Sequence, residues 1–261
     1  MTVFPQGRSH RAALISAMCA LVVTGTGLTG CGAEDPNAGT NGVGKLPADE
    51  IQARTNKAAR GANAVHLSGS VVSNGRTYKL DMRLKADGGT GSVTTQDTTF
   101  RLLRVGEHLF LKADTDFWAD EEDKGGEGAE GSGGKDSDAD AEAAEKLDGK
   151  YVKVPQGDPA YQRFTGFTDK DVLLDGLLTL HGTLATDGHH ERFGIRTIRI
   201  TGDKGSGGTL DVSLEGKPYP LLLARAGNAG TIRLTDWGKD FPLEEPEKNE
   251  MVDYGQQLPE S

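Results

Sequence analysis

Apolar and polar residues alternate along much of the chain after residue 64. The clearest run places Tyr78, Leu80, Met82, Leu84 and Ala86 at every second position, with Thr, Lys, Asp and Arg between them. This period of two is typical of antiparallel strands that have one covered face and one wet face. Similar runs occur at 65–71, 100–102, 109–111, 151–154, 195–200, 210–214, 219–223 and 232–234. About nine or ten antiparallel strands are therefore expected, joined largely as hairpins.

Turns and two helical segments complete this pattern. Turns are expected at Asn74–Gly75, Gly88–Gly89 and Gly106. Pro47 starts a weakly amphipathic helix that ends near Gly61. A second helix follows Thr168 as its cap, with Asp171 at the third position of a capping box, and carries apolar residues around much of its circumference: Val172, Leu173, Leu174, Leu177 and Leu178. A helix this apolar is expected to be covered on most sides.

Alternating strands and an all-round apolar helix together require a concave face. The sequence therefore predicts an α+β fold with a curved antiparallel sheet and helices in its concavity. Seven residues are candidates for lining an apolar cavity: Tyr78, Leu80, Met82, Leu84, Val172, Leu173 and Leu177. The same residues would equally form a filled core, and the sequence leaves both readings open.

The N-terminus has the organisation of a secretory signal. Arg8 and Arg11 precede an uncharged apolar stretch at 12–23, too short for the roughly 20 residues that span a bilayer. Leu28-Thr29-Gly30-Cys31 resembles the bacterial lipobox. We therefore expect cleavage before Cys31 and a diacylglyceryl anchor on its thiol, with an uncleaved anchor helix as the alternative.

The mature chain divides by composition. Residues 31–45 are rich in Gly, Asn and Thr and predict a flexible tether, followed by a folded domain at 46–246 and a tail at 247–261. Residues 119–148 contain twelve acidic and three basic side chains and predict a disordered insertion. Asp136, Asp138 and Asp140 imitate the start of a calcium loop, but Ala141 and Leu147 replace the Gly and Glu that such a loop needs.

Familiar catalytic motifs are not found in the sequence. It has neither a G-x-S-x-G elbow nor a phosphate-binding G-x-x-x-x-G-K-[ST] loop. His189, His190 and Glu191 form one dense cluster of ligand-type side chains, for which an exposed polar turn is favoured over a metal site. His66, His108 and His181 are interpreted as structural. The net charge of -10, with no basic aromatic stripe, disfavours a nucleic-acid partner.

Two regions of the chain carry a resemblance to a known family. The strand before Asn74–Gly75, the strand 76–86 and Gly89-Thr90-Gly91-Ser92-Val93 resemble the opening of actinobacterial LppX/LprG-type lipoproteins. Pro218-Tyr219-Pro220-Leu221, the run 230–238 and Pro246 are similar to that family's closing hairpin. The resemblance implies a LolA/LolB-like half-barrel, a strongly curved and incompletely closed sheet with helices inside, and binding of lipids or acylated glycolipids. Only Cys31 carries over residue by residue.

These observations lead to two competing functions. The first is a membrane-anchored envelope lipoprotein that binds or transfers lipid in an apolar cavity. The alternative is a ligand-free extracytoplasmic module that engages a membrane protein or wall component. A surface hydrolase is a distant third, and no catalytic residue, metal or cofactor is expected. The chain is expected to be a monomer at the outer face of the cell membrane.

Overall fold

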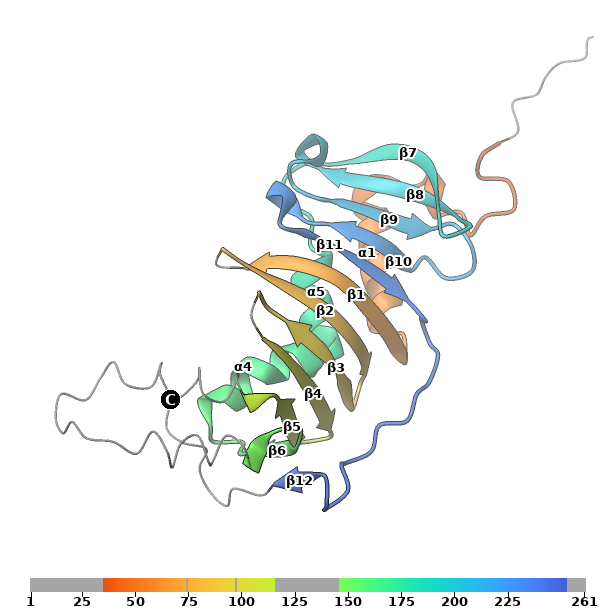
Figure 1. Ribbon diagram of the computed structural model, residues 1–261. Coiled ribbons are helices and arrows are strands. Elements are labelled where there is room, and N and C mark those ends of the chain that lie inside the picture. The colour runs from red at the N-terminus through yellow and green to blue at the C-terminus, as the bar shows by residue number, and fades with distance from the viewer. Residues whose placement is uncertain (1–34, 74, 97, 116–145, 253–261) are drawn as a thin grey trace, which may run out of the picture. The chain divides into compact units, whose positions relative to one another are not determined.

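One large sheet organises the protein. A computed structural model describes residues 35–73, 75–96, 98–115 and 146–252, and the chain from Pro36 onward forms one compact unit. Its twelve described strands follow the order β12-β6-β5-β4-β3-β2-β1-β11-β10-β9-β8-β7 (Figure 1). All neighbours are antiparallel except β12 and β6, which run parallel. The strands are β1 Ala64–Ser73, β2 Arg76–Lys85, β3 Gly88–Thr94, β4 Thr99–Val105, β5 His108–Ala113, β6 Tyr151–Val154, β7 Leu184–Arg192, β8 Ile195–Gly202, β9 Thr209–Ser213, β10 Pro220–Ala224, β11 Gly230–Thr235 and β12 Met251–Val252.

Three described α-helices lie along the concave side of the curled sheet (Figure 1). They are α1 Ala48–Arg60, α4 Pro159–Thr168 and α5 Lys170–Leu178, and short 3-10 turns occur at Val43–Lys45, Asp203–Gly205 and Ala226–Asn228. The predicted fold class, an antiparallel half-barrel with helices in its concavity, is thus confirmed. The first helix was also predicted correctly, because its boundaries match the expected start at Pro47 and end near Gly61.

Three strands lie outside the predicted set. The Gly88–Gly89 pair begins β3 instead of forming a turn, since Gly88 pairs with Val105 and a Cβ there would overlap the carbonyl of Arg104. β7 was expected as a polar turn because its residues are polar on both faces. β12 consists of only two residues, too short for any periodicity. These differences explain why the sheet has more strands than the sequence predicted.

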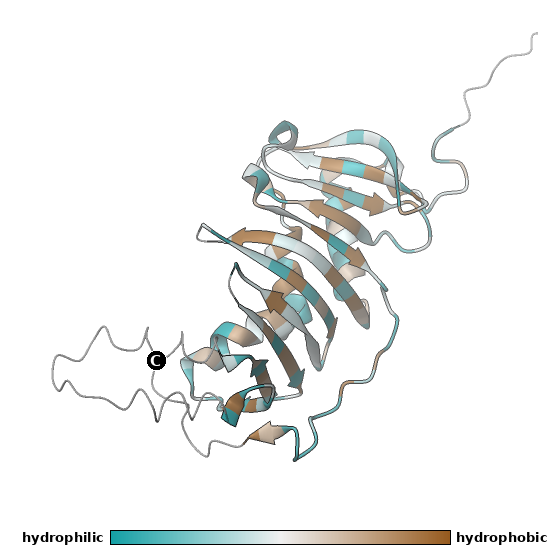
Figure 2. Cartoon of the chain, viewed as in Figure 1, coloured by the Kyte–Doolittle hydropathy of each residue, from teal (hydrophilic) through white to brown (hydrophobic). Residues whose placement is uncertain are grey.

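The register places one apolar row after another on the inner face. Directly paired residues share a face, so pairing can be followed from strand to strand. One such row passes through Ile200, Leu210, Leu223, Ile232, Gly69, Leu80, Val93, Phe100 and Ala113. A parallel row passes through Leu67, Met82, Gly91, Leu102, Leu111 and Val152. Figure 2 shows this alternation as brown bands that cross the strands.

The second helical region differs from its prediction in how it begins. Two helices replace the single one, and Asp169 caps α5 by accepting hydrogen bonds from the backbone N–H of Asp171 and Val172. Thr168, the expected cap, is instead the fully buried last residue of α4. Aspartate accepts from the first-turn N–H groups at least as well as threonine, which accounts for the displaced cap.

Residues 41–45 pack on the sheet, whereas the sequence predicted a flexible tether through Lys45. The Asn41 side chain donates to the carbonyl of Ser213 at 2.9 Å, and its backbone N–H donates to Leu214 at 2.8 Å. Val43, the one branched apolar residue of this segment, is only 3% exposed. One apolar side chain and a few specific hydrogen bonds therefore hold a segment whose composition is otherwise polar.

The chain after β11 covers part of the outer face of the sheet. Phe241 lies beneath the ammonium of Lys85, and Glu245 contacts the ring of His108. The outer face of β4 and β5 carries two buried apolar residues that pair with each other, Leu103 and Phe110. The segment ends as β12 beside β6, so Met251 and Val252, which were expected to lie in a tail, belong to the sheet.

The insertion expected at 119–148 ends earlier than predicted. Leu147 is 4% exposed and belongs to the hydrophobic core, and its carbonyl accepts from Lys150. The signal, Cys31 and the Asp136–Asp140 run lie outside the described residues. Within the described chain, no helix has the length and apolar character needed to cross a membrane.

Candidate functional site

The concave face of β1–β4 and the helices above it form the candidate site. Four of the seven candidate lining residues are buried there, with exposed fractions of 4% for Leu80, 0% for Met82, 0% for Leu84 and 5% for Leu177. Tyr78 and Leu173 are partly buried against the same core. The structure therefore brings six of the seven candidates into one apolar layer.

Val172 is the exception among the candidates. Its side chain is 60% exposed, so this residue faces solvent and does not line the interior. The expectation that α5 is covered on most sides is wrong at this position, because the helix has one open side. Val172 is one of the first residues of α5, and its backbone N–H is bound by the Asp169 side chain. The capped first turn thus fixes Val172 on the outward side.

Two glycines of β3 allow the helices to approach the sheet. Gly89 pairs with Leu84, and a Cβ at Gly89 would lie 3.2 Å from the carbonyl oxygen of Thr168. Gly91 pairs with Met82, and a Cβ there would lie 2.6 Å from the Met82 sulfur. The α4–α5 junction and the Met82 side chain therefore occupy the space that larger β3 residues would take.

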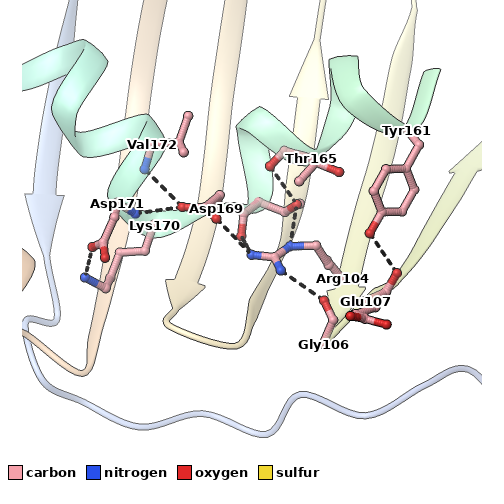
Figure 3. A network of polar contacts seen from close by, with 10 residues as sticks. Arg104, Gly106, Glu107, Tyr161, Thr165, Asp169, Lys170, Asp171 and Val172 are labelled. Atoms are coloured by element: carbon pink, nitrogen blue, oxygen red, sulfur yellow. Dashed lines mark hydrogen bonds and ion pairs between the residues drawn. The ribbon is translucent and has the colours of Figure 1, made fainter. Parts of the chain in front are cut away.

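A buried arginine binds the α4–α5 junction to the sheet (Figure 3). Arg104 on β4 is 9% exposed and pairs with Gly89 on the inner face. Its guanidinium donates to the Thr168 hydroxyl at 3.2 Å, to the Thr168 carbonyl at 3.1 Å and to the Gly106 carbonyl at 2.9 Å. The Asp169 carboxylate lies 3.7 Å from the same group and supplies the counter-charge. Together these partners compensate for burying a permanent cation.

A second set of polar contacts attaches α5 to α1. The Lys170 side chain is 2% exposed, donates to the carbonyl of Arg60 at 2.9 Å and also contacts the carboxylate of Asp171. Arg60 in turn forms a two-pronged pair with Asp175, with both N–O distances at 2.9 Å. The helices are therefore joined into one layer by a few charged contacts, and Arg104 joins that layer to the sheet.

Buried polar atoms without hydrogen-bond partners occur in the helix layer. Among the described residues they include Gln52 Oε1, Thr55 Oγ1 and Asn56 Oδ1 on α1, and Thr165 Oγ1 on α4. Thr55 is fully buried within the core-facing stripe of α1. Buried acceptors normally find a partner, so these atoms are available to hydrogen-bond a polar group of a bound molecule.

The two histidines of the cluster lie on opposite faces of the strand that carries them. His189 pairs with Ile198 on the inner face, and His190 pairs with Thr197 on the outer face. His189 Nε2 lies 3.1 Å from the Asn37 side-chain oxygen, and His190 Nε2 lies 2.7 Å from the carbonyl of Asp187. Across the described residues, no three His, Cys, Asp or Glu side chains gather in a way that could hold a metal ion.

Comparison with known proteins gives similarity at the level of architecture. No family model and no curated protein matches the chain. LprF from Mycobacterium bovis is 14% identical, with a TM-score of 0.48 over 76% of this chain and 96% of LprF. The Mycobacterium tuberculosis lipoprotein LppX is 16% identical, with a TM-score of 0.42 over 75% of this chain and 99% of LppX. An uncharacterised conserved protein from Thermus thermophilus is 9% identical, with a TM-score of 0.35. The structural neighbours thus include lipoproteins of the kind that the sequence resembles.

Arg104 is one of the site residues that the sequence reasoning missed. Phe100 and Leu102 belong to one of the predicted alternating runs, and the same period of two places residue 104 on their face of the strand. A charged residue at an inward position of an apolar strand is the signal that could have revealed it, because such a charge requires buried partners.

Proposed function

We propose that this protein is a membrane-anchored envelope lipoprotein that binds or transfers lipid between the concave face of its sheet and its helix layer. The observation that carries the proposal is the apolar row from Ile200 on β8 to Ala113 on β5. Nine strands contribute to this row, so it follows the curved sheet for about 40 Å at a strand spacing of about 4.8 Å. A continuous apolar path of this shape suits extended acyl chains.

The energetics favour acyl chains as the ligand. Each methylene that leaves water for an apolar environment contributes about 0.8 kcal/mol, so a long chain gains several kcal/mol along such a path. The partnerless acceptors of α1 and α4 would bind hydroxyl groups near the polar end of the lipid. Entry would require the helix layer to move away from the sheet, and the Arg104–Thr168 contacts would control that movement.

Native mass spectrometry tests lipid binding directly. Protein expressed from Gly32 onward contains every described residue and is expected to copurify with two-chain lipid adducts. Leu84→Trp should reduce these adducts while the fold survives, because the larger side chain fills space that the acyl chain would use. Phe110→Trp is the matched control, since Phe110 is fully buried on the outer face and should not change adduct formation.

The competing proposal is a ligand-free interaction module. It is supported by the complete burial of Met82 and Leu84, which is equally expected of a packed core. Adduct-free protein that also fails to bind an apolar fluorescent dye would favour this module. Strong destabilisation by Leu84→Trp, at roughly 1 to 3 kcal/mol for an overpacked core, would favour it further.

The anchor has its own test. Cys31→Ala is expected to abolish incorporation of labelled fatty acid and to leave unprocessed precursor, because the only other cysteine, Cys19, lies inside the expected signal. Continued labelling of the variant would overturn the assignment of Cys31 as the anchor.

A further inference from the structure

The turn between β7 and β8 carries an exposed aromatic residue in an unfavourable backbone conformation. Phe193 and Gly194 have φ angles of 56° and 77°, both in the left-handed region, as in a type I′ hairpin turn. Asn or Gly is favoured at such positions, and a bulky aromatic residue is strained there. Phe193 is also 49% exposed. Folding alone therefore does not account for phenylalanine at this position, and strained residues of this kind point to a function.

A cation without a carboxylate partner lies against the same ring. The Arg233 guanidinium on the outer face of β11 is 3.7 Å from the Phe193 ring centroid. Neighbouring arginines have carboxylate partners, which are Asp211 for Arg192 and Arg199, and Glu215 for Arg196. Within the described part of the chain, Arg233 has none. Phe193 and Arg233 thus form an exposed pair of an apolar ring and an unneutralised cation, named here the Phe193–Arg233 patch.

The same hairpin holds the N-terminal segment of the folded unit. Arg196, three residues after Phe193, donates to the carbonyls of Ala38 at 3.0 Å and Gly39 at 3.3 Å. Cys31 precedes Ala38 by only seven residues. Seven residues reach at most about 25 Å when fully extended. A lipid on Cys31 would therefore hold this hairpin close to the membrane surface.

We propose that the Phe193–Arg233 patch is a contact site for an anionic lipid surface. The Phe193 ring would lie at the boundary between headgroups and acyl chains, where aromatic side chains are favoured. The Arg233 guanidinium would bind headgroup phosphates, which match its planar array of donors. This inference rests on the lipid anchor of the proposed function. Because two acyl chains already anchor the protein, the patch serves to orient the domain on the membrane.

Vesicle cosedimentation of the protein from Gly32 onward tests the patch without the lipid anchor. We expect binding to phosphatidylcholine vesicles that contain about one third phosphatidylglycerol, and weaker binding as salt rises. Phe193→Asn should lower the partition coefficient at least about fivefold without unfolding the protein, because Asn tolerates the left-handed conformation. Arg233→Gln should lower it on anionic vesicles and not on pure phosphatidylcholine.

Two matched control positions, away from the Phe193–Arg233 patch, lie where β1 ends and β2 begins. Val72 is 36% exposed, and Arg76 begins β2 at that end. Val72→Asn and Arg76→Gln remove the same kinds of side chain and should leave partition unchanged. Unchanged binding by Phe193→Asn, or an equal loss in the controls, would overturn the patch. Lipid adducts in the native mass spectrum of Phe193→Asn report separately on the proposed function, since Phe193 lies outside the apolar interior.

Discussion

Arg104 of β4 donates to both the side-chain hydroxyl and the backbone carbonyl of Thr168, at 3.2 Å and 3.1 Å. This pair connects the inner face of the sheet to the residue at which α4 ends and α5 begins. The Thr168 carbonyl at this junction also lies close to Gly89 of β3. Arg104 is therefore a side chain that joins the α4–α5 junction to the inner face of the sheet by hydrogen bonds.

Replacing Arg104 by Met should weaken both the fold and the attachment of the helices. Three hydrogen bonds from a buried cation are lost, and the Thr168 carbonyl is left without this donor. A loss of about 2 to 3 kcal/mol in the free energy of unfolding is expected. Urea denaturation monitored by circular dichroism measures it. If α4 and α5 detach more readily, uptake of an apolar fluorescent dye should also accelerate.

Arg104→Lys provides the control for charge alone. Lysine keeps the cation but cannot present the fork that reaches the Thr168 hydroxyl, the Thr168 carbonyl and Gly106 together. We expect a stability between those of the wild type and Arg104→Met. Equal stability of all three proteins would contradict the role assigned to Arg104.

A second buried ionic cluster lies on the outer face of β7–β9. Asp211 is 2% exposed and binds Arg192 at 2.7 Å and Arg199 at 2.9 Å. Asp211→Asn removes the carboxylate that Arg192 pairs with and leaves Arg199 only the more distant Asp187 carboxylate, at 3.7 Å, so the free energy of unfolding should fall by about 2 to 4 kcal/mol. Guanidinium denaturation is the measurement. Asp81→Asn, at a carboxylate that is 65% exposed and lies 2.9 Å from His66 Nε2, should change stability by less than about 0.5 kcal/mol.

The sequence predicted the parts of the fold that bury one face of an amphipathic element. The run from Leu80 to Leu84 became β2 because its alternation matches a sheet with a covered inner face. β7 was not predicted as a strand because it lies at the edge of the sheet. Most of its residues are exposed there, so apolar and polar residues need not alternate. Position within a sheet is a tertiary property, and periodicity alone cannot supply it.

The candidate site was predicted less completely for a similar reason. Four of the lining candidates are buried, because apolar side chains are buried whichever element carries them, and their lining of a cavity stays a prediction. Val172 was misplaced because an all-round apolar helix does not reveal which side stays open. Arg104 and Lys170 were missed because their buried partners include the carbonyls of Thr168 and Arg60, which are distant in the sequence.

Deletion of the acidic insertion and substitution of Leu147, which lies close after it, should have opposite effects on stability. Deleting residues 121–145 removes no large apolar side chain, so the thermal transition should stay nearly unchanged. Leu147→Ala, only two residues further on, removes a core side chain that is 4% exposed and should cost about 2 to 5 kcal/mol. Differential scanning calorimetry of both variants makes the comparison. A large shift on deletion, or none on Leu147→Ala, would contradict the boundary drawn here.

Alkaline pH should weaken the attachment of β12 through Tyr151. Partial burial raises the pKa of the Tyr151 phenol above its usual value near 10; Arg101 opposes this rise, and Glu250 adds to it. The folded state therefore holds the phenolic proton more tightly than the unfolded state does. The resulting stabilisation is fully present below about pH 10 and is lost as pH rises through the raised pKa. Between these values the free energy of unfolding should fall more steeply for the wild type than for Tyr151→Phe. Denaturant titrations from about pH 9 to about pH 11, roughly one unit on either side of the usual tyrosine pKa, measure this difference. Parallel slopes would show that Tyr151 ionises as freely in the folded protein as in the unfolded chain.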